Sequence, residues 1–519
     1  MSERLTGEFI ASFDIGSSAV KCVLVSRDGQ IQGAHTVSYR AAATHSEQDV
    51  EDWWIAFGEA LQNWWAQGVV PSSIAAITFS GQMQSLIALD AQGAVLRKAL
   101  LHTDARASVE AAHITEKIGA DEIHRVTRNP FNATSVLPKM LHLSDHEPDT
   151  WARTERVLMG AKDFITQRLT SRAVCDPTTA ATTGMFDIEQ GTWAHPWLAA
   201  LGLKPVLPEL LNAHERVGVV TLQAAALTGL QAGCPVLCGL GDAAATTLGA
   251  GVSDPSQCYA YLGTSGWVAR VSQRFNPQGA PLFVLPYLPT LPSEPARRIL
   301  IGPISNAGVV HRWALSLLDS SDRSDISEPQ RYAQFEQAVA AAPFDANLMF
   351  LPYLGSERLP VNSAAGQGAL VGLSMHTTRA QMMRAALEGV SLSLRWAFDL
   401  LRPVREGAEG TSSGELIVVG GATRSAAWMQ ILANTFDAPL RIAANADLLP
   451  CLGAAATAAV ALGWSASAED FVMQGRQTAG HGVEHTVLPA APAALDMQAK
   501  SARWRALQAA VSTVTSSPH

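Results

Sequence analysis

The chain has 519 residues, of which 48% are hydrophobic and 16% are charged. A chain of this length is expected to form two or more domains, and its composition is typical of a globular protein rather than a disordered one. The net charge is −9 and no block of basic residues stands out, which argues against nucleic acid and anionic membranes as partners.

The polar N-terminus, the length of the apolar stretches and the pattern of cysteines predict a cytoplasmic protein. The N-terminus is short and polar and lacks the basic-then-apolar pattern of a secretion signal. The most apolar long stretch, residues 452–462, is too short to span a bilayer. The six cysteines fit neither a zinc motif nor a disulfide framework, so we expect small buried thiols in a reducing compartment. The fourteen histidines are interpreted as scattered, and no zinc site is predicted.

Strand-like runs alternate with amphipathic helices along the chain, which is typical of an α/β protein. In the first half, the predicted strands are residues 9–13, 20–25, 31–37 and 74–80. A helix is predicted over residues 50–67. Its aromatic residues recur on one face, which favours a core stripe over a ligand-stacking surface.

A second cycle of elements begins near residue 257. Its predicted strands are residues 258–262, 267–271, 299–301 and 415–419, and its predicted helices are residues 307–318, 379–401, 425–437, 451–462 and 493–511. The pattern breaks at residues 251–257, which predicts two domains, at residues 1–252 and 253–519. The loop 405–414 and the tail 513–519 are expected to be mobile.

One short pattern occurs in both halves. Residues 14–18 follow the first strand and residues 263–266 follow the first strand of the second cycle, and in each case another strand follows at once. The Gly and hydroxyl residues of such a turn place backbone N–H groups and hydroxyls on one concave rim, which suits a phosphate. We therefore predict two related domains that hold one nucleotide between them.

Two aspartates stand at turns where they could take part in chemistry. Asp14 ends a strand and begins the first turn, where a carboxylate is placed to hold Mg²⁺ through water, and Lys21 could offset phosphate charge. An ordinary hairpin explains that turn equally well. Asp242 follows Gly239-x-Gly241 and opens a helix whose dipole favours its ionised form, so it is a candidate acceptor for a hydroxyl proton.

The segment around Asp242 also has other interpretations. Asp242 could be a plain N-cap. The segment also fits a dinucleotide fingerprint, but only weakly, because the acidic residue expected about twenty positions later is missing. A Walker A loop is excluded because the chain contains no Gly-Lys pair.

Two further turns suggest ligand contacts. The pair Gly420-Gly421 follows a strand and precedes a helix, so its backbone can lie against an adenine or ribose, although a structural turn is as good an interpretation. Gln82 and Gln84 flank Met83 after another strand. Amides both donate and accept hydrogen bonds, which suits a neutral polyhydroxy compound.

Taken in order, these segments resemble the FGGY carbohydrate kinases of the sugar kinase/actin-like ATPase superfamily, over residues 9–463. The most specific part is the run Gly368-x-Leu370-x-Gly372-Leu373, which is followed, after seven intervening residues, by Gln381-Met382-x-x-Ala385-Ala386-Leu387-Glu388. It matches the family's second signature at every defined position. The block 351–358 also looks like a family segment. Xylulokinases are the most similar members, on residues 46–54, 80–83 and 104–106.

The resemblance implies an α/β fold of two ribonuclease-H-like domains with a cleft between them, with ATP and Mg²⁺ as cofactors. A homodimer is one candidate assembly. Asp242 would be the base, and Asp14 with Asp242 would serve the metal. The residues assigned to phosphate and nucleoside are Gly16, Ser17, Ser18, Lys21, Gly263, Thr264, Ser265, Gly308, Gly420, Gly421, Ala422 and Ser425. Those assigned to the sugar are Gln82, Met83, Gln84, Asp104, Asp242 and Ala243.

Several positions depart from the xylulokinase pattern. Gln84 stands where histidine is usual, Ala243 where asparagine is usual, His102-Thr103 where Trp-Asn is usual, and His142 where tryptophan is usual. The implied activity is transfer of the γ-phosphate of ATP to a terminal hydroxyl of a ketopentose, with D-xylulose first and another ketose or a polyol as the alternative. A non-catalytic sugar or ATP sensor and a nicotinamide dehydrogenase are the other classes considered.

Overall fold

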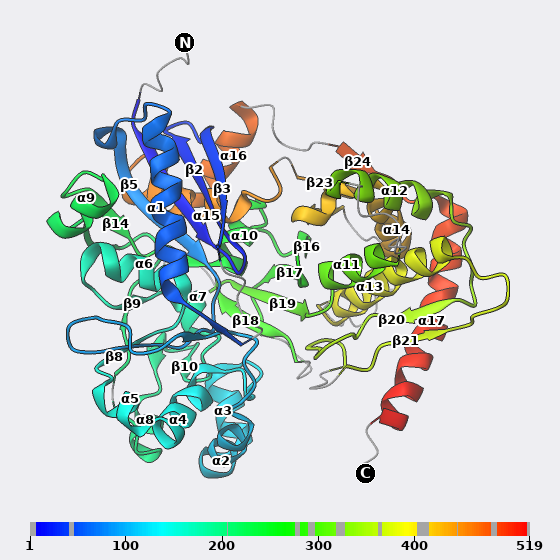
Figure 1. The fold of residues 1–519 in the computed structure, drawn as a ribbon, viewed down its shortest axis with the longest axis horizontal. Helices are drawn as coiled ribbons and strands as arrows, with labels where there is room; N and C mark the ends of the chain where they lie inside the picture. Colours follow the sequence, from blue (N-terminus) through cyan, green and yellow to red (C-terminus); the bar gives the residue numbers. More distant parts are fainter. Residues whose placement is uncertain are drawn as a thin grey trace.

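The computed structural model describes residues 7–40, 46–204, 206–275, 281–288, 296–317, 327–361, 366–401, 415–443, 445–478 and 485–515. It contains two large mixed β-sheets, one in each half of the chain, with helices packed around them (Figure 1). The loop predicted at residues 405–414 lies outside the described residues, as does the end of the predicted tail. Residues 513–515 continue the last helix.

The first sheet has β1 at its centre, and its strands follow the order β13-β14-β5-β1-β2-β3, with β15 paired to β5. The strands are β1 (Phe9–Ile15), β2 (Ala19–Ser26), β3 (Ile31–Ser38), β5 (Ile74–Gly81), β13 (Arg216–Val219), β14 (Pro235–Leu237) and β15 (Leu240–Gly241). Strand β1 is buried along its whole length, antiparallel to β2 and parallel to β5. Strand β2 is antiparallel to β3, which forms one edge.

The second sheet repeats this topology. Its strands are β16 (Cys258–Leu262), β17 (Gly266–Ser272), β18 (Phe283–Pro286), β19 (Arg298–Ile304), β22 (Leu416–Val419), β23 (Leu440–Ile442) and β24 (His485–Val487). The order β19-β17-β16-β22-β23 corresponds to β3-β2-β1-β5-β14, with the same antiparallel and parallel pairs around the central strand. The predicted pair of related α/β domains is confirmed.

Helix α1 (Val50–Ala66) covers one face of the first sheet. Its residues Trp53, Phe57 and Trp64 are buried, and the ring of Phe57 lies 4.7 Å from that of Phe13 in β1. The aromatic stripe is therefore core, as its spacing predicts. None of the six cysteines forms a disulfide bond within the described residues, and five of them are buried.

A group of short elements extends the first half below its sheet and was not predicted from the sequence pattern (Figure 1, cyan). Its helices are α2 (Ser108–Ile118), α3 (Ala120–Thr127), α4 (Val136–His146), α5 (Pro148–Arg153), α7 (Pro177–Ala180) and α8 (His195–Ala200). Its strands are β4 (Glu47–Gln48), β6 (Ile87–Leu89), β7 (Ala99–Leu100), β8 (Arg156–Leu158), β9 (Val174–Cys175), β10 (Phe186–Asp187), β11 (Thr192–Trp193) and β12 (Glu209–Leu210). Two other helices of the first half, α6 (Ala161–Thr170) and α9 (Leu222–Thr228), pack beside α1, with α6 also against β1, β5 and β14. A 3-10 turn, η1 (Pro71–Ser73), precedes β5.

The helices of the second half surround its sheet. They are α11 (Gly308–Ser316), α12 (Glu328–Ala341), α13 (Arg379–Leu401), α14 (Ala426–Phe436), α17 (Ala491–Thr515) and the 3-10 turn η2 (Gly421–Arg424), with a hairpin of β20 (Met349–Leu351) and β21 (Ala369–Val371). The long helix α13 packs against β17, β19 and β20. The predicted helix 379–401 has these bounds.

Helix α15 (Leu449–Ala461) belongs to the second half of the sequence but packs on α10 (Asp242–Gly249), β1 and β5 of the first half. Ser12 Oγ of β1 donates a hydrogen bond to the Cys451 carbonyl at 2.6 Å. The helix α16 (Ala468–Thr478) follows it, and the Gln30 side chain donates to the Gly475 carbonyl at 2.8 Å. The boundary predicted at residues 251–257 lies just after α10, so α15 and α16 cross back over it.

Helices α10 and α15 touch at backbone level. A Cβ atom added to Gly453 would lie 2.0 Å from the Ala245 carbonyl oxygen, and one added to Gly249 would lie 2.0 Å from the Leu449 carbonyl oxygen. No side chain larger than hydrogen fits at either crossing point, so the two glycines set the distance between the helices.

Gly453→Ala is expected to force α10 and α15 apart and to lower the free energy of unfolding by about 1–3 kcal/mol, which is typical of overpacking. The matched control is Gly58→Ala in α1, where an added Cβ meets nothing within 4 Å. That control should be neutral or should stabilise by up to about 1 kcal/mol, because alanine favours a helix. Urea unfolding of both variants measures the effect, and equal stabilities would show that the close crossing is not required.

Candidate active site

A cavity of about 940 Å³ is lined by residues from both halves of the chain. From the first half come the turn after β1, the segment after β5 and the start of α10. From the second half come the turn after β16, the start of α11 and the turn after β22. Strands β1 and β5 are parallel to each other, as are β16 and β22, so these segments meet at the carboxyl ends of parallel strands, where α/β proteins bind ligands.

Most of the predicted site residues line this cavity. They are Asp14, Gly16, Ser17, Ser18, Lys21, Gln82, Met83, Gln84, Asp242, Ala243, Gly263, Thr264, Ser265, Gly308, Gly421, Ala422 and Ser425. Gly420 and Asp104 are not among the lining residues. The structure therefore brings together segments that lie more than 400 residues apart in the sequence.

Asp14 lies near the end of β1, opposite Lys21 of β2 and Ser80 of β5. Ser80 Oγ donates to Asp14 Oδ1 at 2.9 Å. Burial raises the pKa of Asp14, while the charge of Lys21 and the bond from Ser80 act against that rise. Lys21 Nζ also donates to the Asp447 carbonyl at 2.9 Å, just before α15. The carboxylate is thus held at a fixed position on the cavity wall.

The turn after β1 presents its hydroxyls to the cavity. The Gly16 N–H donates to the Ala19 carbonyl at 3.1 Å, and Tyr39 donates its phenol hydrogen to the Gly16 carbonyl at 2.7 Å. These bonds hold the base of the turn. Ser17 and Ser18 at its tip are exposed and line the cavity.

Asp242 is the first residue of α10, and Gly241 is the N-cap, so the interpretation of Asp242 as a plain N-cap is wrong. Its Oδ1 accepts a hydrogen bond from the Ala243 N–H at 2.8 Å. A Cβ atom on Gly241 would lie 2.0 Å from Met83 Sδ, so the start of the helix and the predicted sugar segment can approach this closely only with glycine there.

A buried ion cluster supports the start of α10. Lys162 Nζ lies 2.6 Å from Asp163 Oδ1 and 2.9 Å from Asp176 Oδ2. Asp176 accepts hydrogen bonds from the Thr178 side chain and N–H, and Thr178 Oγ1 in turn accepts from the Gly241 N–H at 2.9 Å. The orientation of Asp242 is therefore tied through Gly241 to charges that are themselves paired.

Arg358 is a cavity residue that the sequence analysis did not assign. Its Nε donates to Ser305 Oγ at 3.4 Å, and the buried Glu357 beside it accepts from the Asn306 N–H at 3.2 Å. Burial lowers the pKa of Arg358, against the charges of Glu357 and Asp242. The signal that could have found it was the block 351–358, which the resemblance marked without a role.

The turn after β16 is joined to the start of α11. The Gly263 N–H donates to the Ser265 carbonyl at 2.9 Å, and the Gly308 N–H donates to the Gly263 carbonyl at 2.9 Å. The Val309 N–H donates to the Thr264 carbonyl at 3.2 Å, which leaves the Thr264 side chain exposed in the cavity. The two predicted phosphate turns therefore both present hydroxyls to one space.

Helix α12 and the start of α14 form the far end of the cavity. Glu336 accepts from Ser425 Oγ and from the Ala427 N–H, the latter at 3.0 Å. His311 and Tyr332 also line the cavity, with ring centroids 5.7 Å apart. No sequence motif links Glu336, His311 or Tyr332 to the turn at Gly421, so these residues were not predicted.

Gln82 and Gln84 lie at the opposite end. Gln82 Nε2 donates to the Gly16 carbonyl at 3.4 Å, while its buried Oε1 has no hydrogen-bond partner in the described part of the chain. A buried amide oxygen without a partner is available to a ligand hydroxyl. Gln84 has a φ of 64°, an uncommon conformation for a residue other than glycine.

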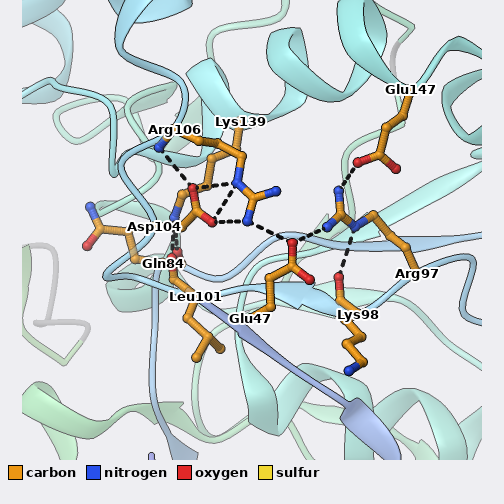
Figure 2. A network of polar contacts seen from close by, with 9 residues as sticks. All are labelled: Glu47, Gln84, Arg97, Lys98, Leu101, Asp104, Arg106, Lys139 and Glu147. Atoms are coloured by element: carbon orange, nitrogen blue, oxygen red, sulfur yellow. Dashed lines mark hydrogen bonds and ion pairs between the residues drawn. The ribbon is translucent and has the colours of Figure 1, made fainter. Parts of the chain in front are cut away.

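Lys139 of α4 holds this segment from behind (Figure 2). It is fully buried and donates to the Gln84 carbonyl at 3.1 Å and to the Leu101 carbonyl at 2.7 Å. Burial lowers the pKa of Lys139 to about 7, against the charge of Asp104. The two bonds fix the conformation of Gln84 and the position of the loop that carries His102, another cavity residue.

Asp104 lies behind the cavity wall. Arg106 Nε donates to Asp104 Oδ1 and Oδ2 at 3.0 and 2.8 Å, and Arg106 Nη2 reaches Glu47 at 2.7 Å. Arg97 continues the network to Glu47 and Glu147 (Figure 2). A direct contact of Asp104 with a sugar stays a prediction.

The two halves of the chain match two family models. The model of the "FGGY family of carbohydrate kinases, N-terminal domain" matches residues 9–249, and that of the C-terminal domain matches residues 258–462. The chain belongs to the FGGY family of carbohydrate kinases. This FGGY kinase is therefore a phosphotransferase, and the dehydrogenase alternative is removed.

Individual relatives agree with this assignment. The xylulose kinase of Escherichia coli is 31% identical over 454 residues, which cover 86% of this chain and 89% of the relative. Two solved structures from Lactobacillus acidophilus, a ligand-bound xylulose kinase and a gluconate kinase, each reach a TM-score of 0.82 at 24% identity. They cover 97% and 98% of this chain and 98% of each neighbour. These two structures show the fold alone.

Among the described residues of this FGGY kinase, no helix is long and apolar enough to cross a membrane.

Two carboxyl groups, those of Asp14 and Asp242, line the FGGY kinase cavity. Burial and the negative charge of Asp14 raise the pKa of Asp242 to about 7, while Arg358 acts in the opposite direction. A carboxyl group with a pKa near neutrality can exchange a proton at physiological pH. The mutual repulsion also means that a cation between the two carboxylates would be favoured, so this donor set fits a hard divalent ion.

The raised pKa predicts how Asp242 affects stability. The folded chain binds a proton at Asp242 more tightly than the unfolded chain, so this contribution is complete at low pH and is lost as pH rises through about 7. The stability of Asp242→Asn relative to the natural chain should therefore increase as pH rises from about 4 to about 7 and stay constant above that. Urea unfolding of both proteins in magnesium-free buffer measures the difference. The control is Asp121→Asn at an exposed position. A difference in stability between Asp242→Asn and the natural chain that does not change with pH would contradict the prediction.

Proposed function

We propose that this FGGY kinase transfers the γ-phosphate of ATP to a terminal hydroxyl of a 2-ketopentose, with D-xylulose as the first candidate. The observation that carries the proposal is the position of Asp242. It opens α10 within a cavity that is lined by both phosphate turns and by the segment 82–84. The relationship to a xylulose kinase over most of both chains supports the choice of substrate.

The reaction needs one base and a fixed geometry. The sugar hydroxyl oxygen would form a bond to the γ-phosphorus, the bond from that phosphorus to the β–γ bridging oxygen would break, and ADP would leave. The hydroxyl proton would pass to the carboxylate of Asp242. Phosphoryl transfer asks the protein mainly to position groups and to balance charge. The hydrogen bond from the Gly241 N–H to Thr178 positions the start of α10, and the positive charge of Arg358 balances negative charge near Asp242.

Asp14 and Asp242 are the residues that would hold Mg²⁺. When bound, the ion supplies charge neutralisation to the β- and γ-phosphates. Asp14 is suited to this role because Ser80 and Lys21 hold it in place at the edge of the phosphate turn.

The two phosphate turns would bind different parts of ATP. Ser17, Ser18 and Thr264 offer hydroxyls to the phosphates, and the backbone around Gly421 with the ring of Tyr332 offers a surface to the nucleoside. Closure of the two halves around both substrates would exclude water and limit ATP hydrolysis.

The sugar end of the cavity suits a neutral polyhydroxy compound. Gln82 and Gln84 contribute amides and Met83 a thioether, and these groups need no charge on the ligand. Gln84 and Ala243 differ from the usual xylulokinase residues and both line the cavity. Another ketose or a polyol is therefore the alternative substrate.

Asp242→Ala is expected to reduce sugar-dependent ADP release by at least about 100-fold, because a positioned base contributes 10²–10⁴-fold to catalysis. Coupled ADP release across a panel of ketoses, aldoses and polyols measures this and identifies the substrate in the natural protein. Asp121→Asn is the control and should keep full activity. Near-normal turnover by Asp242→Ala would remove the base assignment, and sugar binding without ADP release in the natural protein would point to a sensor.

The substrate proposal is tested by Gln84→His combined with Ala243→Asn. Both changes restore residues usual in xylulokinases, and histidine is among the residues that tolerate the positive φ at position 84. The ratio of kcat/KM for D-xylulose to that for the other sugars should rise. Gln84→Asn, which keeps an amide and also tolerates this backbone, is the matched control. Unchanged relative rates across the panel would show that these positions do not select the sugar.

A further inference from the structure

Three side chains converge on one point outside the cavity. Glu110 of α2 has its Oε1 2.8 Å from His142 Nδ1 and 3.0 Å from His146 Nε2, both of α4. The two imidazole rings stack with centroids 4.2 Å apart. All three donor atoms lie within 4.8 Å of one another. The interpretation of the histidines as scattered is wrong for this pair, because His142 and His146 are four residues apart on α4.

We propose that Glu110, His142 and His146 bind a divalent transition-metal ion, with Zn²⁺ as the first candidate. Two imidazole nitrogens and one carboxylate oxygen are donors that Zn²⁺ accepts, whereas Mg²⁺ and Ca²⁺ prefer oxygen alone. A tetrahedral ion would take a water molecule as its fourth ligand. This site is separate from the proposed magnesium position at Asp14 and Asp242.

The spacing of the donor atoms suits such an ion. Bonds of about 2.0–2.1 Å in a tetrahedral site place donor atoms about 3.3 Å apart. The separations from Glu110 to His142 and His146 are a few tenths of an ångström shorter than this value. A small outward movement of the side chains would therefore admit the ion, with no change in the backbone of α2 or α4.

The burial of Glu110 supports a ligand at this point. The Glu110 side chain is only 5% exposed, and its second oxygen, Oε2, is buried without a hydrogen-bond partner among the described residues. Hydrogen bonds from two neutral imidazoles account for Oε1 but leave Oε2 unpaired, which carries a desolvation cost. A cation would balance the whole carboxylate. The His146 side chain is 58% exposed, so an ion has a path from solvent.

The site lies on the helix that supports the sugar end of the cavity. Lys139, three residues before His142 on α4, holds the carbonyls of Gln84 and Leu101. A metal ion that joins α2 to α4 would restrain the same helix without touching either substrate. His142 also stands where the family resemblance expects tryptophan, so the site belongs to this chain rather than to the shared signature.

The test is isothermal titration of untagged, chelator-treated protein with Zn²⁺, in a buffer with excess Mg²⁺ to occupy the active-site carboxylates. One ion per chain is expected. His146→Gln should weaken Zn²⁺ binding by at least about tenfold, because it removes a ligand from a site where even second-shell changes cost 10–100-fold. The matched control is His113→Gln, an exposed histidine of α2 outside the cluster, and it should bind like the natural protein.

Thermal unfolding gives a second readout. Zn²⁺ should raise the unfolding midpoint of the natural protein and of His113→Gln, but not that of His146→Gln, and the exposure of His146 means that its replacement leaves no cavity in the core. Absence of Zn²⁺ binding, or equal binding and equal midpoint shifts in the two variants, would overturn the proposal and leave Glu110 as a hydrogen-bond acceptor only. Sugar-dependent ADP release is measured separately, so failure here leaves the proposed kinase reaction untouched.

Discussion

The contact between α10 and α15 is the constraint on which the active site depends. Glycines at the crossing let the two backbones touch, and the same α15 packs on β1 and β5. Asp14 is at the end of β1 and Asp242 is at the start of α10. The distance between the two carboxyl groups is therefore set by helix and strand packing rather than by a flexible loop, which is how a site gains a fixed geometry.

The packing places the negative charges of Asp14 and Asp242 in the same cavity, and other charged groups lie around them. The charge of Asp14 raises the pKa of Asp242, which is useful for proton transfer and for holding a cation but unfavourable for folding. Lys162, Asp163 and Asp176 form a buried cluster close by, in which Lys162 pairs with both carboxylates, while Asp163 Oδ2 has no hydrogen-bond partner among the described residues. The structure thus separates charges that serve the reaction from charges that anchor the backbone.

Much of the fold could be predicted from sequence because its central strands and long helices have strong apolar patterns. The strand predicted at 258–262 and the helix predicted at 379–401 have those bounds in the structure. Elements of two or three residues, such as β7 and β12, carry no period long enough to recognise. The longer helix α6 is buried along most of its length and includes buried polar residues, so it has no one-sided apolar stripe, and it was also missed. Site residues within glycine and hydroxyl motifs were found. Glu336 and Arg358 were missed because only tertiary packing brings them to the cavity. The same holds for Glu110, which lies 32 residues from His142 on another helix.

The return of α15 to the first sheet has a consequence for how the chain is made. One face of β1 and β5 is covered by residues 449–461, which leave the ribosome about 370 residues after β5, whose last residue is Gly81. The domain that begins first during synthesis is therefore completed nearly last. A fragment ending near residue 252 would present the apolar side of α10 and β1 to solvent, so the first half needs α15 to complete its core despite the duplicated topology.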